Sequence, residues 1–259
     1  GEARLDAELM LCEATGLGRA ALAARPEAAV DAAAARRFGT MLRRRLAREP
    51  LAYVLGRRGF RRIELTVDQR VLVPRPETEM LVELALELAP RTVLDVGTGS
   101  GAVALAVADE LEGVEVVATD VSPGALAVAR ANAERLRLAD RVRFELGSVP
   151  AEPRRFDLLL ANLPYVTEAE MATLAPEVAR WEPRGALVAG ADGLDAIRGL
   201  TGALARGAAS AAAVGLEVGT GQGAAVAALL AGAGYPGAEV RRDLAGHERL
   251  VVGRRSGGA

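Results

Sequence analysis

The stretch TVLDVGTGSG at residues 92–101 joins a short apolar run to a loop that contains three closely spaced glycines. Such a run, bounded by turn-forming residues, is typical of a buried strand. Gly97, Gly99 and Gly101 let the backbone turn sharply and approach a ligand, just before the amino terminus of an expected helix. The pattern therefore predicts a nucleotide-like cofactor at the carboxyl end of a parallel strand.

Strand-like and helix-like segments alternate after residue 90. We expect helices at 101–111, 123–136, 193–206 and 222–233, and strands at 92–96, 114–119, 142–146, 156–161, 213–218, 238–242 and 248–253. This alternation predicts an α/β fold with a doubly wound, mostly parallel sheet. The last two strands are separated by a link too short for a crossover helix, so they should form an antiparallel hairpin at the sheet edge.

The first part of the chain has a different texture. Residues 1–58 are expected to form a small helical domain, including a helix over 32–46 that Asp31 caps. The β-rich runs at 62–67 and 71–73 predict a linking hairpin within residues 59–73. Residues 74–259 would then form the larger domain, which starts with a helix whose first turn holds proline and acids.

Composition limits the class of protein. Apolar residues make up 51% of the chain and charged residues 25%, which is typical of a globular protein with a sizeable core. No apolar run approaches the ~18 residues that a membrane-spanning helix needs, and the amino terminus lacks a signal-peptide pattern. The single cysteine argues against a disulfide framework. These features predict a cytoplasmic protein that does not enter membranes.

The net charge of −2 carries no nucleic-acid signature for the chain as a whole. One local group of arginines departs from this balance, namely Arg43, Arg44, Arg45, Arg48, Arg57, Arg58, Arg61 and Arg62. A solvated helix face and turn is one interpretation. The other is a patch that steers an acidic partner or ribosomal RNA.

Acidic residues accompany the glycine loop. Asp95 can buttress the loop or bind a ligand ammonium, and Asp120 ends the next strand-like run. Asp120 follows Gly101 by about 20 residues, where an acid can accept hydrogen bonds from both hydroxyls of a ribose. A nicotinamide-binding loop would read G-x-G-x-x-G, whereas this loop reads G-x-G-x-G. The spacing therefore favours S-adenosylmethionine.

A second glycine-rich segment, EVGTGQG at 217–223, also follows a strand-like run. Asp243 lies about 20 residues beyond it, so spacing alone does not exclude a nucleotide site there. However, Asp243 is expected in the closing hairpin rather than at the end of a parallel strand. We interpret the second loop as structural, and also His247, the only histidine, which falls in the same hairpin.

The run 156–161 leads into Asn162, Leu163, Pro164 and Tyr165. An amide or exocyclic amine is a poor nucleophile because its lone pair is delocalised, and a site can help by accepting hydrogen bonds from both N–H groups. Asn162 offers its side-chain oxygen and Leu163 its backbone carbonyl, which Pro164 projects by keeping Leu163 extended. Tyr165 supplies a flat wall. These residues predict methyl transfer to a planar nitrogen through positioning and electrostatics.

Taken together, the motifs resemble the PrmC/HemK family, the protein-glutamine N5-methyltransferases that modify class 1 peptide chain release factors. The resemblance covers nearly the whole chain. The most discriminating motif is PRPETE at 74–79, because many methyltransferases share the glycine loop. Other matching motifs are EPLAY at 49–53, DVGTGSG at 95–101, ATDVSP at 118–123, NLPY at 162–165, EP at 182–183 and DLAG at 243–246.

The resemblance implies a seven-stranded S-adenosylmethionine-dependent methyltransferase domain and a helical N-terminal domain that helps to recognise the release factor. It implies substrate-binding and catalytic roles for residues 162–165, which would hold the glutamine of a Gly-Gly-Gln motif. Stable nucleic-acid binding is not expected. The cofactor would contact Gly97, Thr98, Gly99, Ser100, Gly101, Asp120, Val149 and Asn162.

The chain departs from the family pattern in three places. Leu163 replaces the first proline of Asn-Pro-Pro-Tyr, and Ser148 stands where many members have an acid at the adenine contact. The family's first helix is expected to precede residue 1. These departures leave two alternatives to release factor methylation. One is transfer to another protein glutamine or to a nucleic-acid amino group, and the other is a catalytically impaired binding module.

Overall fold

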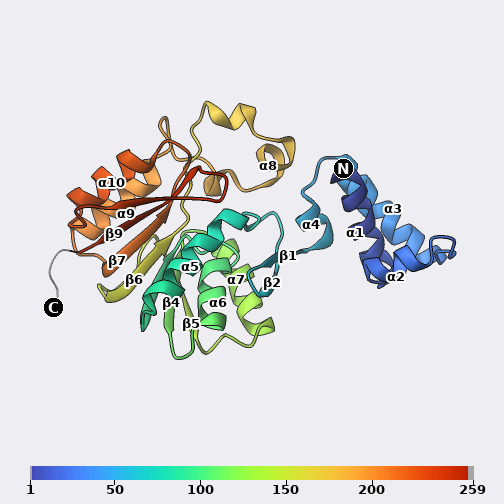
Figure 1. Ribbon diagram of the computed structural model, residues 1–259, viewed down its shortest axis with the longest axis horizontal. Helices are drawn as coiled ribbons and strands as arrows, with labels where there is room; N and C mark the ends of the chain where they lie inside the picture. The colour runs from blue at the N-terminus through green and yellow to red at the C-terminus, as the bar shows by residue number, and fades with distance from the viewer. Residues whose placement is uncertain (1, 256–259) are drawn as a thin grey trace.

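The computed structural model describes residues 2–255, with a helical N-terminal region beside a larger α/β region (Figure 1). The N-terminal helices are α1 (Glu2–Thr15), α2 (Arg19–Ala24), α3 (Ala32–Leu46) and α4 (Leu51–Leu55). The helix expected over 32–46 is confirmed, and so is its cap, because the Asp31 carboxylate accepts hydrogen bonds from two backbone N–H groups of the first turn. A small core holds these helices together, formed by Met10, Ala14, Met41 and Val54.

The linking hairpin lies earlier in the chain than the strand prediction placed it. Strand β1 (Arg57–Phe60) pairs antiparallel with β2 (Ile63–Thr66). The expected pairing of 62–67 with 71–73 is therefore wrong. Gly56 adopts a φ of 72° and ends α4, so the chain turns directly into β1. Residues 71–73 are held by side chains instead, because the Tyr53 hydroxyl donates to the Val71 carbonyl at 2.5 Å.

A seven-stranded sheet forms the centre of the larger region, in the order β5-β4-β3-β6-β7-β9-β8. Strands β3 to β7 run parallel, whereas β9 pairs antiparallel with both β7 and β8. This confirms the doubly wound sheet and its closing hairpin. The strands are β3 (Thr92–Val96), β4 (Glu115–Asp120), β5 (Val142–Leu146), β6 (Arg155–Ala161), β7 (Ser210–Glu217), β8 (Glu239–Arg242) and β9 (Glu248–Arg254).

Helices cover both faces of the sheet (Figure 1). On one face α5 (Glu79–Leu88), α6 (Ala102–Glu110) and α7 (Pro123–Arg135) pack on one apolar cluster, and on the other α9 (Asp195–Ala205) and α10 (Gly223–Gly232) pack on a second. Alternate residues of one strand enter different clusters, since side chains point to opposite faces. Shorter helices precede α5 and α9, namely η1 (Pro76–Thr78), η2 (Glu170–Thr173), α8 (Pro176–Trp181) and η3 (Arg184–Ala186).

One buried asparagine ties the linking hairpin to the glycine loop. Asn132, on α7, has no exposed surface. Its Oδ1 accepts a hydrogen bond from the Thr66 N–H at 2.8 Å, and its Nδ2 donates to the carbonyls of Thr66 and Ser100 at 3.0 Å each. A single side chain thus satisfies three backbone groups from two distant segments.

Replacing Asn132 with alanine should lower the free energy of unfolding by about 3 kcal/mol, because three hydrogen bonds are lost and their backbone partners stay buried. Urea denaturation would measure the change. Glu134→Ala, at an exposed position two residues further along α7, is the matched control and should change stability little. A loss of less than about 0.5 kcal/mol for Asn132→Ala would contradict the anchoring role.

Candidate active site

The glycine loop between β3 and α6 depends on backbone conformations that favour glycine. Gly97, Gly99 and Gly101 have φ angles of 74°, 56° and 84°. The N–H groups of Gly97 and Thr98 both donate to the Thr119 carbonyl at 2.9 Å, which fastens the loop to the end of β4. A Cβ on Gly99 would meet no protein atom within 4 Å, so this glycine faces open space. The loop therefore presents a bare backbone surface at the amino terminus of α6.

Asp95 lies beneath this loop and is only 2% exposed. Its Oδ2 accepts hydrogen bonds from the Thr98 hydroxyl at 2.6 Å and from the Ala104 N–H at 3.2 Å. Burial raises the pKa of Asp95 to about 7, although these two hydrogen bonds act in the opposite direction. Of the two roles that the sequence left open for Asp95, the structure places it as the buttress of the loop.

Asp120 lies at the end of β4, on the open side of the glycine loop. Its two carboxylate oxygens accept hydrogen bonds from the backbone N–H groups of Gly99 at 2.9 Å and Ser122 at 2.8 Å. The residue is partly exposed. Each carboxylate oxygen can accept more than one hydrogen bond, so Asp120 remains able to bind hydroxyl groups of a ligand.

The segment 162–165 follows β6, directly beside the glycine loop. Asn162 Nδ2 donates to the Thr78 hydroxyl at 2.9 Å, and a Cβ on Gly97 would lie 2.9 Å from Leu163 Cδ2. The segment borders a cavity of about 270 Å³, lined by Leu72, Arg75, Asn162, Leu163, Tyr165, Val166, Leu174, Val178, Ala186 and Leu187. A small planar group would fit such a cavity.

The second glycine-rich segment supports Tyr165, as its structural interpretation requires. Gln222 Oε1 accepts from the Gly219 N–H at 2.8 Å, and Gln222 Nε2 donates to the Tyr165 carbonyl at 3.1 Å. A Cβ on Gly193 would lie only 2.1 Å from that carbonyl oxygen, so only glycine fits there. Asp243 lies in the β8–β9 turn and accepts from the His247 N–H at 2.9 Å, as expected.

Sequence reasoning missed two polar side chains around the segment 162–165. Thr78, in the PRPETE motif, is buried and contacts Asn162. Glu217 at the end of β7 is also buried, and its Oε1 lies 3.4 Å from the Tyr165 hydroxyl that donates to it. An acid at the carboxyl end of an apolar parallel strand was the available signal, but the glycines that follow Glu217 drew the interpretation to the loop.

An ion pair at the cavity was also missed. Arg75 Nη2 donates to Glu182 Oε1 at 2.6 Å, and Glu182 Oε2 accepts from the Val73 N–H at 3.2 Å. The Glu182 side chain is only 1% exposed, and its burial raises the pKa of this carboxyl. The pair joins the PRPETE and EP motifs, which are separated by more than a hundred residues.

The remaining expected cofactor residues occupy different environments. Thr98 and Ser100 are buried, and the Thr98 hydroxyl is directed to Asp95 beneath the loop. Val149 follows β5 and, like Leu163, is partly buried against the same apolar cluster. Direct contact between these residues and a cofactor stays a prediction.

Most of the arginines that suggested a basic patch are paired with acids. Arg45 bonds to Asp6 at 2.7 Å and to Glu177 at 2.9 Å, and Arg61 bonds to Glu110 at 2.9 Å. Further ion pairs involve Arg44, Arg48, Arg57 and Arg62. These contacts favour the interpretation as a paired surface over that of a free cationic patch.

The chain matches known proteins along nearly all of its length. The PrmC N-terminal domain model matches residues 1–56, and a methyltransferase domain model matches residues 93–185. A release factor glutamine methyltransferase of Cereibacter sphaeroides is 44% identical over 98% of this chain and 91% of its own length. This chain belongs to the release factor glutamine methyltransferase family. A member from Bordetella pertussis is 43% identical over 98% of this chain and 95% of its own.

Solved structures outside this family share the fold. The catalytic domain of human Mettl16 in complex with an RNA hairpin has a TM-score of 0.60 at 15% identity and covers 75% of this chain and 77% of its own. The N-terminal domain of human METTL16 in complex with SAH has a TM-score of 0.54 at 16% identity, covering 75% and 76%. These likenesses confirm the methyltransferase fold that the sequence predicted.

Residues 2–255 contain neither a cluster of metal ligands nor a membrane-spanning helix. No group of three or more His, Cys, Asp or Glu side chains in this range is arranged to hold a metal ion. Within the same range, no helix is both long enough and apolar enough to cross a membrane.

Proposed function

We propose that this member of the family transfers a methyl group from S-adenosylmethionine to the side-chain amide nitrogen (N5) of the glutamine in a Gly-Gly-Gln motif of class 1 release factors. The observation that carries the proposal is the cavity at residues 162–165, a mainly apolar pocket with a few polar side chains that lies directly beside the glycine loop between β3 and α6. In a member of this family, a cavity at this position supports binding of a side-chain amide next to a cofactor on the glycine loop.

The residues at the loop fit S-adenosylmethionine. The bare backbone at Gly99 leaves space for the cofactor, and Asp120 offers carboxylate oxygens to its ribose hydroxyls. When bound, the cofactor supplies an electrophilic methyl group on a sulfonium. The protein's part is to hold the attacking nitrogen in line with that methyl group and to exclude water.

Asn162 and Leu163 would hold the substrate nitrogen by accepting hydrogen bonds from its two N–H groups. The acceptor atoms are Asn162 Oδ1 and the Leu163 carbonyl oxygen. Because Asn162 Nδ2 donates to Thr78, its Oδ1 faces away from Thr78 and is available to accept a hydrogen bond from the substrate. These two hydrogen bonds favour a pyramidal geometry at the amide nitrogen, in which its lone pair is more available for attack on the methyl group. Tyr165 forms a wall of the same cavity.

The cavity also contains a donor, which favours a carboxamide over an isolated amino group. Arg75 lines the cavity and uses one guanidinium nitrogen for Glu182, and its other N–H groups remain for a ligand. A carboxamide has both an NH₂ group and a carbonyl oxygen. The acceptor at Asn162 and the donor at Arg75 therefore complement glutamine.

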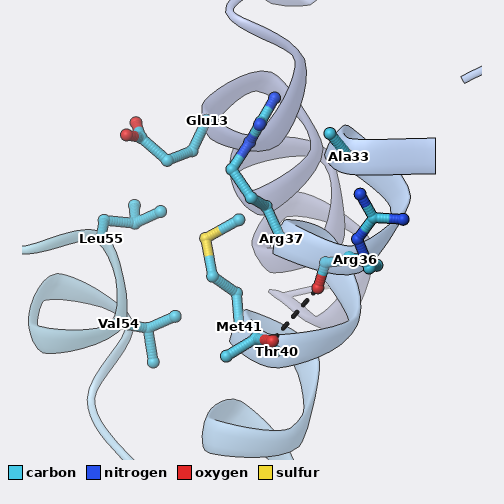
Figure 2. A pocket seen from close by; sticks show the side chains of 8 residues that line it. All are labelled: Glu13, Ala33, Arg36, Arg37, Thr40, Met41, Val54 and Leu55. Atoms are coloured by element: carbon cyan, nitrogen blue, oxygen red, sulfur yellow. Dashed lines mark hydrogen bonds between the residues drawn. The ribbon is translucent and has the colours of Figure 1, made fainter. Parts of the chain in front are cut away.

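We propose that residues 1–58 act as a recognition domain, joined by the linker 59–73 to the catalytic domain 74–259. These helices border a pocket of about 570 Å³. Figure 2 shows its lining, with the charged Arg36, Arg37 and Glu13 beside apolar Met41 and Leu55. Mixed charge and apolar surface suits a protein partner better than a phosphate backbone. The ion pairs of Glu177 on α8 with Arg45 and Arg48 join the helical region to the larger domain.

Replacing Leu163 with proline should change turnover by less than about threefold. The substrate contact is made by the backbone carbonyl of residue 163, and Pro164 already favours an extended conformation of that residue. Single-turnover methylation of a release factor by both proteins would measure the effect. The leucine side chain packs over Gly97, so a slight change in cofactor affinity is expected as well. An inactive wild type that becomes active with Leu163→Pro would overturn the carbonyl argument and favour the binding module.

The function is tested with tritiated cofactor and three acceptors, namely a release factor, a ribosomal protein and DNA. Label on the release factor alone supports the proposal, and Gly-Gly-Gln→Gly-Gly-Ala in that factor should abolish it. Intact factor should be methylated more efficiently than a short Gly-Gly-Gln peptide if residues 1–58 contribute to recognition. Label on DNA alone, or on no acceptor, would contradict the proposal. We place the reaction in the cytoplasm, where translation terminates.

A further inference from the structure

Four side chains from distant parts of the chain form a polar network behind the substrate cavity. They are Thr78 of η1, Asn162 and Tyr165 after β6, and Glu217 at the end of β7. Asn162 Nδ2 donates to the Thr78 hydroxyl, and the Tyr165 hydroxyl donates to Glu217. Thr78 also lies close enough to Glu217 to favour the ionised form of that carboxyl.

Glu217 is unusual because it is 3% exposed and lies among apolar neighbours of the strand end. Its Oε2 has no hydrogen-bond partner within residues 2–255. A buried carboxylate is costly, so its presence here needs a reason. The polar network supplies this reason, because an ionised carboxylate can only accept hydrogen bonds and so fixes the direction in which its neighbours donate.

The direction of each hydrogen bond follows from that restriction. Because the nearby Glu217 carboxylate can only accept, it attracts the one hydroxyl hydrogen of Thr78. The oxygen of Thr78 then has only lone pairs left for Asn162, so it must accept a hydrogen bond from Asn162 Nδ2. The Asn162 amide is consequently held with Oδ1 away from Thr78.

We propose that Thr78 and Glu217 are positioning residues that orient the Asn162 amide, so that its oxygen rather than its nitrogen faces the methyl acceptor. This inference rests on the proposed function of the cavity. A reversed amide would present N–H groups to the two hydrogens of the substrate nitrogen, and would repel them. The same carboxylate steadies Tyr165, so both ends of the segment 162–165 depend on Glu217.

The network should respond to pH. Burial raises the pKa of Glu217 to about 7. The Thr78 hydroxyl lowers this pKa, Glu77 raises it, and Arg249 and the Tyr165 hydroxyl lower it. Once protonated, Glu217 can donate, and the hydroxyl of Thr78 is free to turn toward Asn162. Turnover at saturating cofactor should therefore fall as pH is lowered through about 7.

The first experiment compares three variants in release factor methylation at saturating cofactor. Thr78→Val keeps the shape of the side chain but removes the acceptor, and should lower kcat at least about tenfold with little change in cofactor Kd. Thr78→Ser restores the hydroxyl and should recover most of the activity. Glu217→Gln should lower kcat and abolish the fall near neutral pH.

The matched control is Glu77→Gln, which removes a nearby negative charge without touching the network. It should keep the acid limb and move its midpoint to lower pH, because Glu77 raises the pKa of Glu217. Wild-type kcat in Thr78→Val, equal losses in Thr78→Val and Thr78→Ser, or an unchanged pH profile in Glu217→Gln would each overturn the proposal. Thermal denaturation identifies any variant that fails to fold.

A second measurement does not depend on methylation. The side-chain amide resonances of Asn162 in isotope-labelled protein should shift with a midpoint near pH 7 in the wild type, and should stay constant in Glu217→Gln. No titration in the wild type would overturn the orienting role. A wild type that titrates but does not methylate the release factor would contradict the proposed function and leave the network supported.

Discussion

Replacing Asn162 with alanine should lower single-turnover methylation of a release factor by about a hundredfold to a thousandfold. The change deletes the side-chain oxygen that accepts a substrate N–H, and leaves that hydrogen unpaired in a desolvated cavity. It also removes the donor to Thr78, so the network behind the cavity loses one member. Rapid mixing with saturating tritiated cofactor would measure the rate.

The control for this variant is its affinity for the cofactor product, S-adenosylhomocysteine. The sequence predicted that Asn162 contacts the cofactor as well as the substrate. If the loss lies in the chemical step, the rate at saturating cofactor falls much more than the affinity does. A rate within about threefold of the wild type would remove Asn162 from the proposed catalytic role.

Replacing Asp120 with alanine should weaken cofactor binding by at least about tenfold. Each charge-assisted hydrogen bond to a ribose hydroxyl contributes about 1.5–3 kcal/mol, so loss of two would approach or exceed a hundredfold. The carboxylate also holds the Gly99 N–H, so the glycine loop itself should become less ordered. Isothermal titration calorimetry with S-adenosylhomocysteine would measure the change.

Asp120→Asn serves as the comparison, because it keeps one oxygen and the size of the side chain. It should bind the cofactor more tightly than the alanine variant and less tightly than the wild type. Circular dichroism of both variants would show whether the fold is retained. Unchanged affinity in Asp120→Ala would mean that the ribose lies elsewhere.

Local patterns predicted the regular elements well. The strand over 92–96 and the helix over 32–46 have the predicted bounds, because apolar periodicity, β-branched residues and an N-cap act within a few neighbouring residues. The glycine loop was recognisable because left-handed φ angles at Gly97, Gly99 and Gly101 favour that residue. The linking hairpin was misplaced, since a short apolar run such as 71–73 becomes a strand only if a partner strand lies beside it.

Other features required tertiary contacts. The sequence showed eight clustered arginines but not their partners, and pairs such as Arg45 with Glu177 join residues that are far apart in the chain. Whether a charge is free or paired depends on what the fold brings within about 4 Å, and no local pattern records that. The sequence alone therefore could not distinguish a free cationic patch from a surface of paired arginines.

The sequence by itself determined the family, the order of strands and helices, the glycine loop and the segment 162–165, because each of these is written in contiguous residues. Only the tertiary structure brought Thr78 to Asn162, Glu217 to Tyr165, and Glu182 to Arg75. These side chains come from elements that are separated along the chain but adjacent at the carboxyl edge of the sheet. Hydrogen-bond direction and burial arise from that adjacency, since they depend on which atoms meet rather than on which residues follow one another.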